Sequence, residues 1–523
     1  MRLVLAFLLT IPLSAVEYDW LFRNARVVDG TGNPWFHADV AVVDGRIAAV
    51  GLLQNAGAER IVDASGLTLA PGFIDVHTHI EGTIMEVRFG GNFVFDGVTT
   101  VVTGNCGSSK TDLAEWFSGL EEAGIGLNIA SLIGHNSLRA EVMGSADRHA
   151  TAEELARMRD LVEQGMRDGA VGLSTGLIYI PGVYANTEEV AALAQTASEY
   201  GGVYATHIRS EEASVFEAIE EAIEIGREAD IPVEISHFKV NGRRLWGQSA
   251  KAIAMVERAR AEGIDVVVDQ YPYDRSSTSL NITFPSWALE GGKEKVKERL
   301  QDAGSRQRIA VDMKKILEEQ GQSDYSHAMV AGFGPDPSLE GKTISEINQL
   351  RGREKTLDNE IMTVMEIINQ GGAQMVYQGM SMEDVERILS YPNTAVASDG
   401  GTRVFGKGKP HPRSYGTNAR VLGRFVRERQ LLTLEDAVRR MTSLPARTFG
   451  FRDRGQIREG MAADLVLFDP DEVEDKATFE NPHQYSAGFD LVLVNGEAVI
   501  EDGKLTNRAA GQVLRGSAHD STD

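Results

Sequence analysis

The chain has a single cysteine, Cys106, among its 523 residues. One thiol cannot form an intramolecular disulfide, so the fold must be stable without one. Basic residues are also scarce: 52 Lys and Arg stand against 76 Asp and Glu, which gives a formal net charge of −24. Because an acidic surface repels phosphate backbones, no nucleic acid is expected as a partner.

The sequence also lacks an apolar run of the roughly 20 residues that a membrane-spanning helix needs. A shorter run, Leu3–Leu13, follows the basic Arg2 at the N-terminus. This pattern predicts a secretory signal peptide over residues 1–16, cleaved near Ala15 or Val16. An uncleaved strand or anchor is the alternative. We therefore expect an exported protein, periplasmic or secreted, with no stable membrane insertion.

The two ends of the chain have similar residue patterns, and these patterns differ from that of the middle. Short alternating runs with Gly and "DG" turns fill residues 17–70 and 451–510, as in "DVAVVDGRIAAVG" and "LVLVNGEAVIEDG". Such runs predict antiparallel β-strands. We expect the two pieces to pair into one small β-sandwich that the middle of the chain interrupts, with residues 511–523 as a tail.

Residues 71–450 alternate apolar strands with helical patterns, which indicates β/α units and a parallel sheet. The chain between Tyr273 and Thr394 is too long for one crossover, so an inserted subdomain is expected at about residues 285–350. Eight strand candidates fit an α/β fold of the (β/α)8 TIM barrel type: "GFIDVHTH", "TTVVTGNC", "LNIASLIGHN", "AVGLSTGL", "GVYATHI", "VEISHF", "IDVVVDQYPY" and "TAVASDG".

Residues with metal-ligand chemistry stand at the ends of five of these strands. Active sites of such barrels lie at the C-terminal strand ends, and residues two apart on a strand point the same way. Imidazole, thiolate and carboxylate are the usual ligands of zinc. The sequence therefore predicts a Zn²⁺ site at one mouth of the barrel, built from His77, His79, Cys106, His207, His237 and Asp399.

Each of these residues also has an ordinary structural explanation. A lone His is more often a hydrogen-bonded structural residue, a lone Cys a small buried hydrophobe, and an Asp at a strand end a helix cap. Five strand ends would have to carry such residues by coincidence, so the metal site is favoured. His135, which ends the third strand, stays open between supporting a ligand, facing the substrate and a structural role.

The motif "PGFIDVHTH", the flanking β pieces and Asp399 resemble the amidohydrolase superfamily. The resemblance runs from about residue 17 to residue 510. It implies a zinc-dependent hydrolase barrel with a flanking β-domain. Seven further motifs are similar, in the same order, to the N-acyl-D-amino-acid deacylase (D-aminoacylase) family: "GNCGSS", "GLSTGLIYIPGVYANTEE", "THIRSE", "EISHFK", "DQYPY", "ASDG" and "PHPRSYGT".

The resemblance divides the six candidate ligands between two sites. Strand four, "AVGLSTGL", has no Lys, whereas dihydroorotases and hydantoinases carry a modified Lys there that bridges two metals. The thiolate supplies the anionic ligand instead, which disfavours a cyclic-amide hydrolase. By this resemblance one tight zinc is held by Cys106, His207 and His237, and a second, weaker site is formed by His77, His79 and Asp399.

The ligand set predicts the chemistry. A zinc with three protein ligands keeps a position for water and lowers the pKa of that water to about 7. The metal-bound hydroxide is expected to attack an amide carbonyl that the metal also polarises. Asp399 is the expected catalytic proton shuttle, because an amide nitrogen leaves badly unless it receives the proton taken from the water.

Two cations are placed to bind a substrate carboxylate. Lys239 follows His237 by two residues and therefore points to the same face, and Arg413 offers a guanidinium fork on the loop after strand eight. A surface charge is the alternative for both. Tyr184 is a candidate for polarising the carbonyl. By resemblance, the substrate-binding positions match Lys239, Arg413, Tyr271 and Ser277.

Two stretches depart from the family pattern. The loop "GGTRVFGKGKPHPR", which ends at Arg413, is longer than expected. After strand seven, "DRSSTS" places Asp274 and Arg275 where small apolar residues are expected. Arg209 and Glu211, just after strand five, either support the ligands or form a plain ion pair.

The resulting hypothesis is a zinc amidase that removes the acyl group from N-acyl amino acids of the D series, giving a carboxylate and a free amino acid. A small molecule is then the partner, and the sequence carries no indication of the oligomeric state. One alternative is a zinc amidohydrolase that acts on dipeptides or another linear amide, since the fold and the metal do not fix the substrate. The other is a non-catalytic barrel scaffold, which the intact ligand set argues against.

Overall fold

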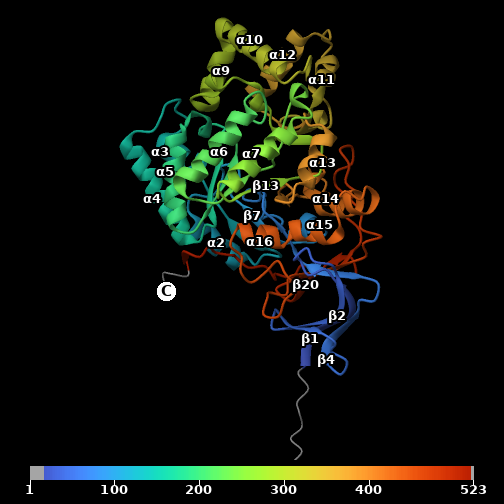
Figure 1. Cartoon of the computed structure of the whole chain (residues 1–523). Coiled ribbons are helices and arrows are strands. Elements are labelled where there is room, and N and C mark those ends of the chain that lie inside the picture. The colour runs from blue at the N-terminus through green and yellow to red at the C-terminus, as the bar shows by residue number, and fades with distance from the viewer. Residues whose placement is uncertain (1–16, 520–523) are drawn as a thin grey trace, which may run out of the picture.

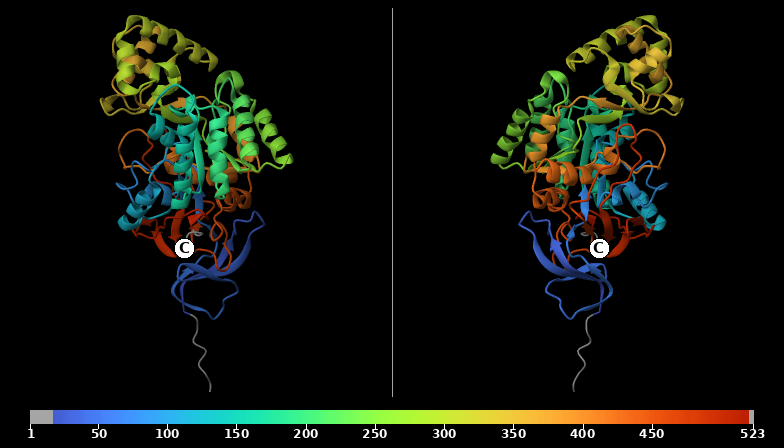
Figure 2. Two further views of the ribbon diagram at one scale, coloured as in Figure 1. Left: turned by 90° about the vertical axis from the view of Figure 1, so that its left-hand side faces the viewer. Right: turned by 90° about the vertical axis from the view of Figure 1, so that its right-hand side faces the viewer.

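The structure is a computed structural model that describes residues 17–519. A terminal β-sheet, a central barrel and a helical insert follow one another along its long axis (Figure 1; Figure 2). The predicted signal peptide, residues 1–16, lies outside the described residues. Within residues 17–519, no helix has the length and apolar character to cross a membrane.

Eight parallel strand positions form the barrel and confirm the predicted fold class. They pair in two sheets, β6-β7-β8 and β9-β10-β11-β12-β13-β17, and a parallel bridge between Thr78 and Gly400 links β6 to β17. The third position is split into two short strands. The barrel strands are β6 (Phe73–Asp75), β7 (Val98–Thr103), β8 (Asn128–Ser131) with β9 (Ile133–Gly134), β10 (Gly172–Gly176), β11 (Val203–His207), β12 (Val233–Ile235), β13 (Val266–Gln270) and β17 (Thr394–Val396).

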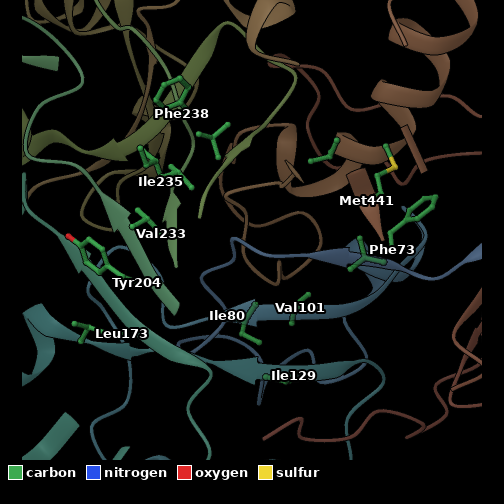
Figure 3. Close-up of a cluster of buried hydrophobic side chains, with 14 of the residues drawn as sticks. Phe73, Ile80, Val101, Ile129, Leu173, Tyr204, Val233, Ile235, Phe238 and Met441 are labelled. Carbon is green, nitrogen blue, oxygen red and sulfur yellow. The ribbon is translucent and has the colours of Figure 1, made fainter. Parts of the chain in front are cut away.

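On several barrel strands, apolar side chains alternate between two buried layers. Val101, Ile129 and Leu173 belong to the layer beneath the helices (Figure 3). Their neighbours Val102 and Ala130 belong to a separate cluster of small residues that fills the barrel interior. Because both faces are buried, most of these strands contain short apolar runs, which is the pattern that predicted them in the sequence.

Helices cover the outside of the barrel, and local signals set their ends. In α4, the Thr151 side chain caps the helix and Glu154 closes the reciprocal hydrogen bond, while Gly169 ends it with φ at 112°. The helices are α1 (Gly91–Val94), α2 (Leu113–Ala123), α3 (His135–Met143), α4 (Ala152–Asp168), α5 (Thr187–Glu199), α6 (Val215–Ala229), α7 (Ser249–Ala261), α13 (Met382–Ser390), α14 (Arg413–Arg420), a following π-helical stretch (Val421–Glu428), α15 (Leu434–Met441) and α16 (Ser443–Thr448).

An inserted unit with its own apolar core separates β13 from β17. It extends beyond the expected residues 285–350, because an antiparallel pairing of its first and last strands closes it. The first strand, "RSSTS", is polar and half-buried, so it gave no apolar pattern to recognise. The insert contains β14 (Arg275–Ser279), α8 (Ser286–Leu289), α9 (Gly292–Gln301), α10 (Ala303–Glu319), β15 (Ala328–Gly332), α11 (Ile344–Leu350), α12 (Leu357–Asn369) and β16 (Gln374–Gln378).

Both chain ends contribute to one nine-stranded sheet, joined where β18 pairs antiparallel with β5. On β18, Leu465 and Leu467 pack into the core of this sheet, while Val466 and Phe468 pack against the barrel. The strands are β1 (Glu17–Val27), β2 (Phe36–Val43), β3 (Arg46–Gly51), β4 (Gly57–Asp63), β5 (Thr68–Pro71), β18 (Leu465–Phe468), β19 (Phe489–Val494), β20 (Glu497–Glu501) and β21 (Lys504–Leu505).

The segment expected as a tail docks on the barrel instead. Val513 forms a parallel bridge to Ile129 of β8. The Ile129 amide donates to the Gln512 carbonyl at 2.9 Å, and the Leu514 amide donates to the Ile129 carbonyl at 2.8 Å. The split between β8 and β9 leaves these backbone groups in need of partners, and the C-terminal segment supplies them.

Candidate metal centre

Buried side chains from four barrel strands meet around Cys106. Its Sγ lies 3.7 Å from Nδ1 of His207 and 3.5 Å from Nε2 of His237. The same sulfur lies 3.4 Å from Nε2 of His77. All four side chains are buried, and the three residues predicted for the tight zinc face one point.

A second group gathers beside the first, at the end of β17. Oδ1 of Asp399 lies 3.2 Å from Nε2 of His79 and 3.8 Å from Nε2 of His77. His77 therefore stands between the two groups, within reach of both the sulfur and the carboxylate. The structure thus brings all six predicted ligands together.

The donor atoms fit a zinc ion. Tetrahedral zinc, with bonds of about 2.3 Å to sulfur and about 2.0–2.1 Å to nitrogen, holds those two atoms about 3.6 Å apart. The observed Sγ–nitrogen distances of 3.5 and 3.7 Å, to His237 and His207, bracket that value. In three overlapping trios of these residues, all ligand atoms lie within 4.8 Å of one another.

Three of the six candidate ligands have a left-handed backbone that L-residues rarely adopt. The φ angle is 52° at Cys106, 37° at His237 and 48° at Asp399. Such conformations cost roughly 1–3 kcal/mol each and persist where the surrounding structure imposes them. They occur here just past the strand ends, where the chain must turn while the side chain still faces the mouth.

Two carboxylates orient the imidazole rings. Oε1 of Glu211 lies 2.9 Å from Nδ1 of His237 and 3.8 Å from Nε2 of His207. Oδ2 of Asp269 lies 2.9 Å from Nδ1 of His77. The 2.9 Å contacts are made at the ring nitrogens of His237 and His77 that do not face the sulfur, and they fix the orientation of these two rings. Among the described residues, Nε2 of His207 has no hydrogen-bond partner.

The structure separates the two roles left open for Arg209 and Glu211. Arg209 pairs with Glu221 at 2.8 Å, while Glu211 supports the ligand rings. Asp269 was missed by the sequence reasoning. An acidic residue within the apolar strand "DVVVDQ" was the available signal, because a buried charge requires a partner.

The charges around the centre keep its thiol and its carboxylate ionised. Burial alone raises the pKa of Cys106, but the neighbouring His77 and His237 bring it well below its usual value. Burial also raises the pKa of Asp399, and the Arg413 guanidinium then brings it well below the usual range. Thiolate and carboxylate are the forms that bind metal ions.

The two predicted cations flank one aromatic ring. The Arg413 guanidinium carbon lies 4.5 Å from the ring centre of Tyr271, and Nζ of Lys239 lies 5.7 Å from it. Arg413 also pairs with Asp399, Nη1 to Oδ2, at 2.9 Å, and Lys239 contacts Glu211. Among residues 17–519, the buried Tyr271 hydroxyl has no hydrogen-bond partner.

Two other predicted residues lie differently. The Ser277 hydroxyl donates to the Met375 carbonyl within the insert sheet, and only its own carbonyl reaches the cations, where it accepts from Arg413 at 3.2 Å. The Tyr184 hydroxyl donates to the carbonyl of Ser286 at 3.1 Å. Tyr184 is therefore not part of the group around the thiol.

A different tyrosine, which the sequence reasoning missed, borders the centre. The Tyr179 ring lies 4.8 Å from the His207 ring, and its hydroxyl lies 3.0 Å from Oγ1 of Thr278. Burial and the charge of Cys106 raise the pKa of this tyrosine well above its usual value, so it stays protonated. The sequence feature that could have identified Tyr179 is its position in "GLIYIPG", directly after strand four.

His135, left open by the sequence, is a buried structural partner. Its Nε2 lies 2.9 Å from Oε1 of Glu189, which Arg139 also approaches at 3.2 Å. All three side chains are buried on the α3 and α5 side of the barrel. This ion cluster joins the two helices and includes none of the candidate ligands.

A cavity of about 710 Å³ opens beside Tyr179. One wall is the loop after β10, with Ile178 and Ile180, and the other is the insert, with Ile282 and Phe284. The lining thus combines apolar side chains with polar ones, among them Lys293 and Lys297, and Tyr179 connects the cavity with the candidate metal centre.

Comparison with known proteins identifies relatives over nearly the whole length. A family described as the amidohydrolase family matches residues 60–500. The chain is 37% identical to the D-aminoacylase of Alcaligenes xylosoxydans xylosoxydans, covering 96% of this chain and 98% of that protein. It is 36% identical to the N-acyl-D-aspartate deacylase of the same organism, covering 97% and 96%.

Solved structures agree with these sequence relatives. A D-aminoacylase described as having a binuclear metal centre matches with a TM-score of 0.81 at 36% identity, covering 95% of this chain and 100% of that one. An N-acyl-D-glutamate deacylase from Bordetella bronchiseptica, complexed with zinc and a phosphonate inhibitor, matches with a TM-score of 0.82 at 35% identity and the same coverage.

Proposed function

The chain belongs to the amidohydrolase family, and on that premise we propose that it hydrolyses the amide bond of N-acyl-D-amino acids. The products are a carboxylate and a free D-amino acid. One observation carries this proposal: a thiolate, imidazoles and a carboxylate converge on one point in a chain that is similar, end to end, to deacylases of D-amino acid derivatives.

Zinc is the metal that these residues fit. Cys106, His207 and His237 would hold the tight ion, and His77, His79 and Asp399 a second, weaker one. Bound there, zinc supplies an acidified water and polarises the carbonyl of the substrate.

Asp399 serves as the proton shuttle. Its Oδ2 is held by Arg413, while Oδ1 faces His79 and the mouth of the barrel. The low pKa keeps the carboxylate ionised, so that Oδ1 is free to accept the proton of the attacking water. The protonated acid is then strong, so it readily delivers that proton to the leaving amine nitrogen.

Arg413 and Lys239 bind the α-carboxylate of the substrate. Both cations lie against the Tyr271 ring, and the free hydroxyl of Tyr271 adds a donor at the same place. An arginine fork binds a carboxylate through two parallel hydrogen bonds, which fixes the amino acid in one orientation. This anchoring favours one enantiomer over the other.

The Tyr179 hydroxyl donates a hydrogen bond to the carbonyl oxygen that is attacked. It stays protonated, and it borders His207 and the thiolate. Its donation strengthens as the oxygen gains negative charge, which stabilises the transition state. The cavity next to it, with Ile178, Ile180, Ile282 and Phe284 in its walls, would accommodate the acyl group.

We also propose that the protein is exported, periplasmic or secreted, after cleavage near Ala15 or Val16. The support is the basic start and apolar run of residues 1–16. Intact-mass measurement of the protein expressed in a bacterial host should find the shortened chain outside the cytoplasm. An unshortened chain in the cytoplasm would contradict export.

Paired substrates test the function. Zinc-loaded protein is incubated with N-acetyl-D- and N-acetyl-L-amino acids and with dipeptides, and the free amino acid is measured. Release from the D series alone supports the proposal. Preferred release from dipeptides would favour the alternative amidohydrolase, and no release from any member of the panel would favour the scaffold.

A further inference from the structure

Arg403 is a cation without an acidic partner near the rim of the metal centre. It stands on the loop between Asp399 and Arg413, and its side chain is partly buried. Its Nε donates to Oγ of Ser414 at 3.2 Å. Within residues 17–519, its Nη1 and Nη2 have no hydrogen-bond or ion-pair partner. The outer pair of nitrogens in its fork can therefore bind a ligand.

The loop that carries Arg403 is fixed in place by Asn92. The buried amide of Asn92 donates to the carbonyls of Gly401 and Ser414, at 3.1 and 2.6 Å. Its Oδ1 accepts from the Arg403 backbone amide at 3.2 Å. The Asn92 side chain thus holds both ends of the loop through hydrogen bonds. The position of Arg403 is therefore fixed by the fold.

This position adjoins the substrate anchor. The guanidinium carbon of Arg403 lies 3.8 Å from the point that a Cβ on Gly401 would occupy, and that point abuts the backbone carbonyl of His79. Ser414, which holds the Nε, directly follows Arg413 in the chain. Arg403 therefore lies near the backbone of the candidate ligand His79 and contacts the residue that follows Arg413, the arginine assigned to the α-carboxylate.

The absence of an acidic partner among the described residues distinguishes Arg403 from two arginines that follow it in the chain. Arg413 pairs with Asp399 at 2.9 Å, and Arg420 pairs with Asp475 at 2.9 Å. Arg403 lacks such a partner, and burial together with the charge of Arg413 lowers its pKa. A partly buried cation beside a like charge is unfavourable, and a bound anion would relieve both costs.

Resting on the proposed function and narrowing its substrate, we propose that Arg403 binds a second carboxylate, carried by the side chain of the substrate's amino acid. The preferred substrates are then N-acyl derivatives of acidic D-amino acids. The planar fork suits a carboxylate better than a neutral amide, because both hydrogen bonds are charge-assisted. Overall similarity leaves this choice open, since the D-aminoacylase and the aspartate and glutamate deacylases match this chain at nearly equal identity.

The test compares isosteric substrates. The kcat/KM ratio of N-acetyl-D-glutamate to N-acetyl-D-glutamine should exceed about 10 in the unmodified protein. Arg403→Met should lower this ratio about 10- to 100-fold, as expected for losing one charge-assisted pair. Arg403→Lys should fall between the two, because a point charge remains without the fork. Lys407→Met, which removes an exposed cation from the same loop, is the matched control and should leave the ratio unchanged.

Further substrates and variants distinguish results that would overturn this inference from results that would overturn the proposed function. N-succinyl-D-alanine carries its second carboxylate on the acyl group, so a loss confined to this substrate in Arg403→Met would overturn the side-chain assignment. A ratio near one in the unmodified protein, or an unchanged ratio in Arg403→Met, would overturn the inference while leaving the proposed function intact. No turnover of any substrate would instead defeat the proposed function. If Arg403→Met does not fold, the unmodified ratio and Arg403→Lys decide the question.

Discussion

The ion pair with Arg413 is the largest of the contacts that keep Asp399 ionised. Its carboxylate is buried, and burial alone would favour the neutral acid. The Arg413 guanidinium, 2.9 Å away, reverses that preference and holds the pKa well below its usual range. The same arginine is assigned to the substrate carboxylate, so substrate binding and proton transfer are coupled through one side chain.

Replacing Asp399 by Asn should abolish the proton shuttle while leaving the tight zinc in place. General acid–base catalysis contributes about 10²- to 10⁴-fold, so kcat should fall by that factor. Metal analysis should still find about one zinc per chain. Asp265→Asn, which alters an exposed ion pair with Arg260, is the matched control. If Asp399→Asn retains more than about a tenth of kcat, another group moves the proton.

Because Cys106 is the only cysteine, its thiol can be followed without background. Zinc bound to the thiolate should protect it from alkylation, and chelation should raise the alkylation rate about tenfold or more. Alkylated protein should then fail to take zinc back, as measured by metal content. Equal alkylation rates with and without chelation would contradict the ligand assignment.

At the scale of elements, the sequence predicted the barrel strands and the candidate ligands at their ends. Most of the eight strands are rich in buried apolar residues, and His207 and Cys106 follow from their places at strand ends. The roles of Asp269 and Tyr179 were not predicted, because they depend on contacts with residues from other strands at the mouth of the barrel. The boundary of the insert was not predicted, because β14 is polar and its pairing with β16 forms only in the folded chain.

The loop after β11 carries a pH-sensitive contact between the barrel and the insert. Oε1 of Glu212 accepts hydrogen bonds from the side chains of Asn241 and Gln320, at 2.9 and 3.0 Å. Burial, then the charge of Glu211, raise its pKa from 4.5 to about 7. The folded protein therefore keeps a proton that the unfolded chain releases.

This contact should make stability fall as pH rises from about 4.5 to about 7, since the folded state binds more protons in that window. The contribution is at most about 3 kcal/mol. Glu212→Gln should remove this part of the pH dependence, measured as Tm against pH. Glu217→Gln, an exposed position on α6, is the control. An unchanged Tm–pH profile in Glu212→Gln would contradict the raised pKa.

At the scale of the whole molecule, the sheet formed by the chain ends lies at one end of the barrel and the insert lies at the other (Figure 2). The sheet built from both ends packs Val466 and Phe468 against the barrel core. The segment around Val513 adds hydrogen bonds to β8. The similar strand patterns at the two ends predicted their pairing, whereas the docking of the last segment could not be read from local patterns, because it depends on contacts with residues hundreds of positions away.

Deleting residues 511–523 should lower Tm by several degrees. Ile129 would lose two backbone hydrogen bonds, each worth about 0.5–1.5 kcal/mol, and the buried Val513 would be lost with them. Arg508→Ala, which removes only an exposed pair with Glu497, is the control and should change Tm little. An unchanged Tm in the truncated protein would show that the docked segment does not stabilise the barrel.

Zinc reconstitution tests the central claim most directly, that a zinc held by Cys106, His207 and His237 supports hydrolysis of N-acyl-D-amino acids. Chelated protein is titrated with zinc, and amino acid release and bound metal are measured on the same samples. We expect no release without metal and a rise that is complete at about one zinc per chain, with no rise in Cys106→Ala. Full release by the metal-free protein, or normal zinc uptake and release by Cys106→Ala, would contradict it.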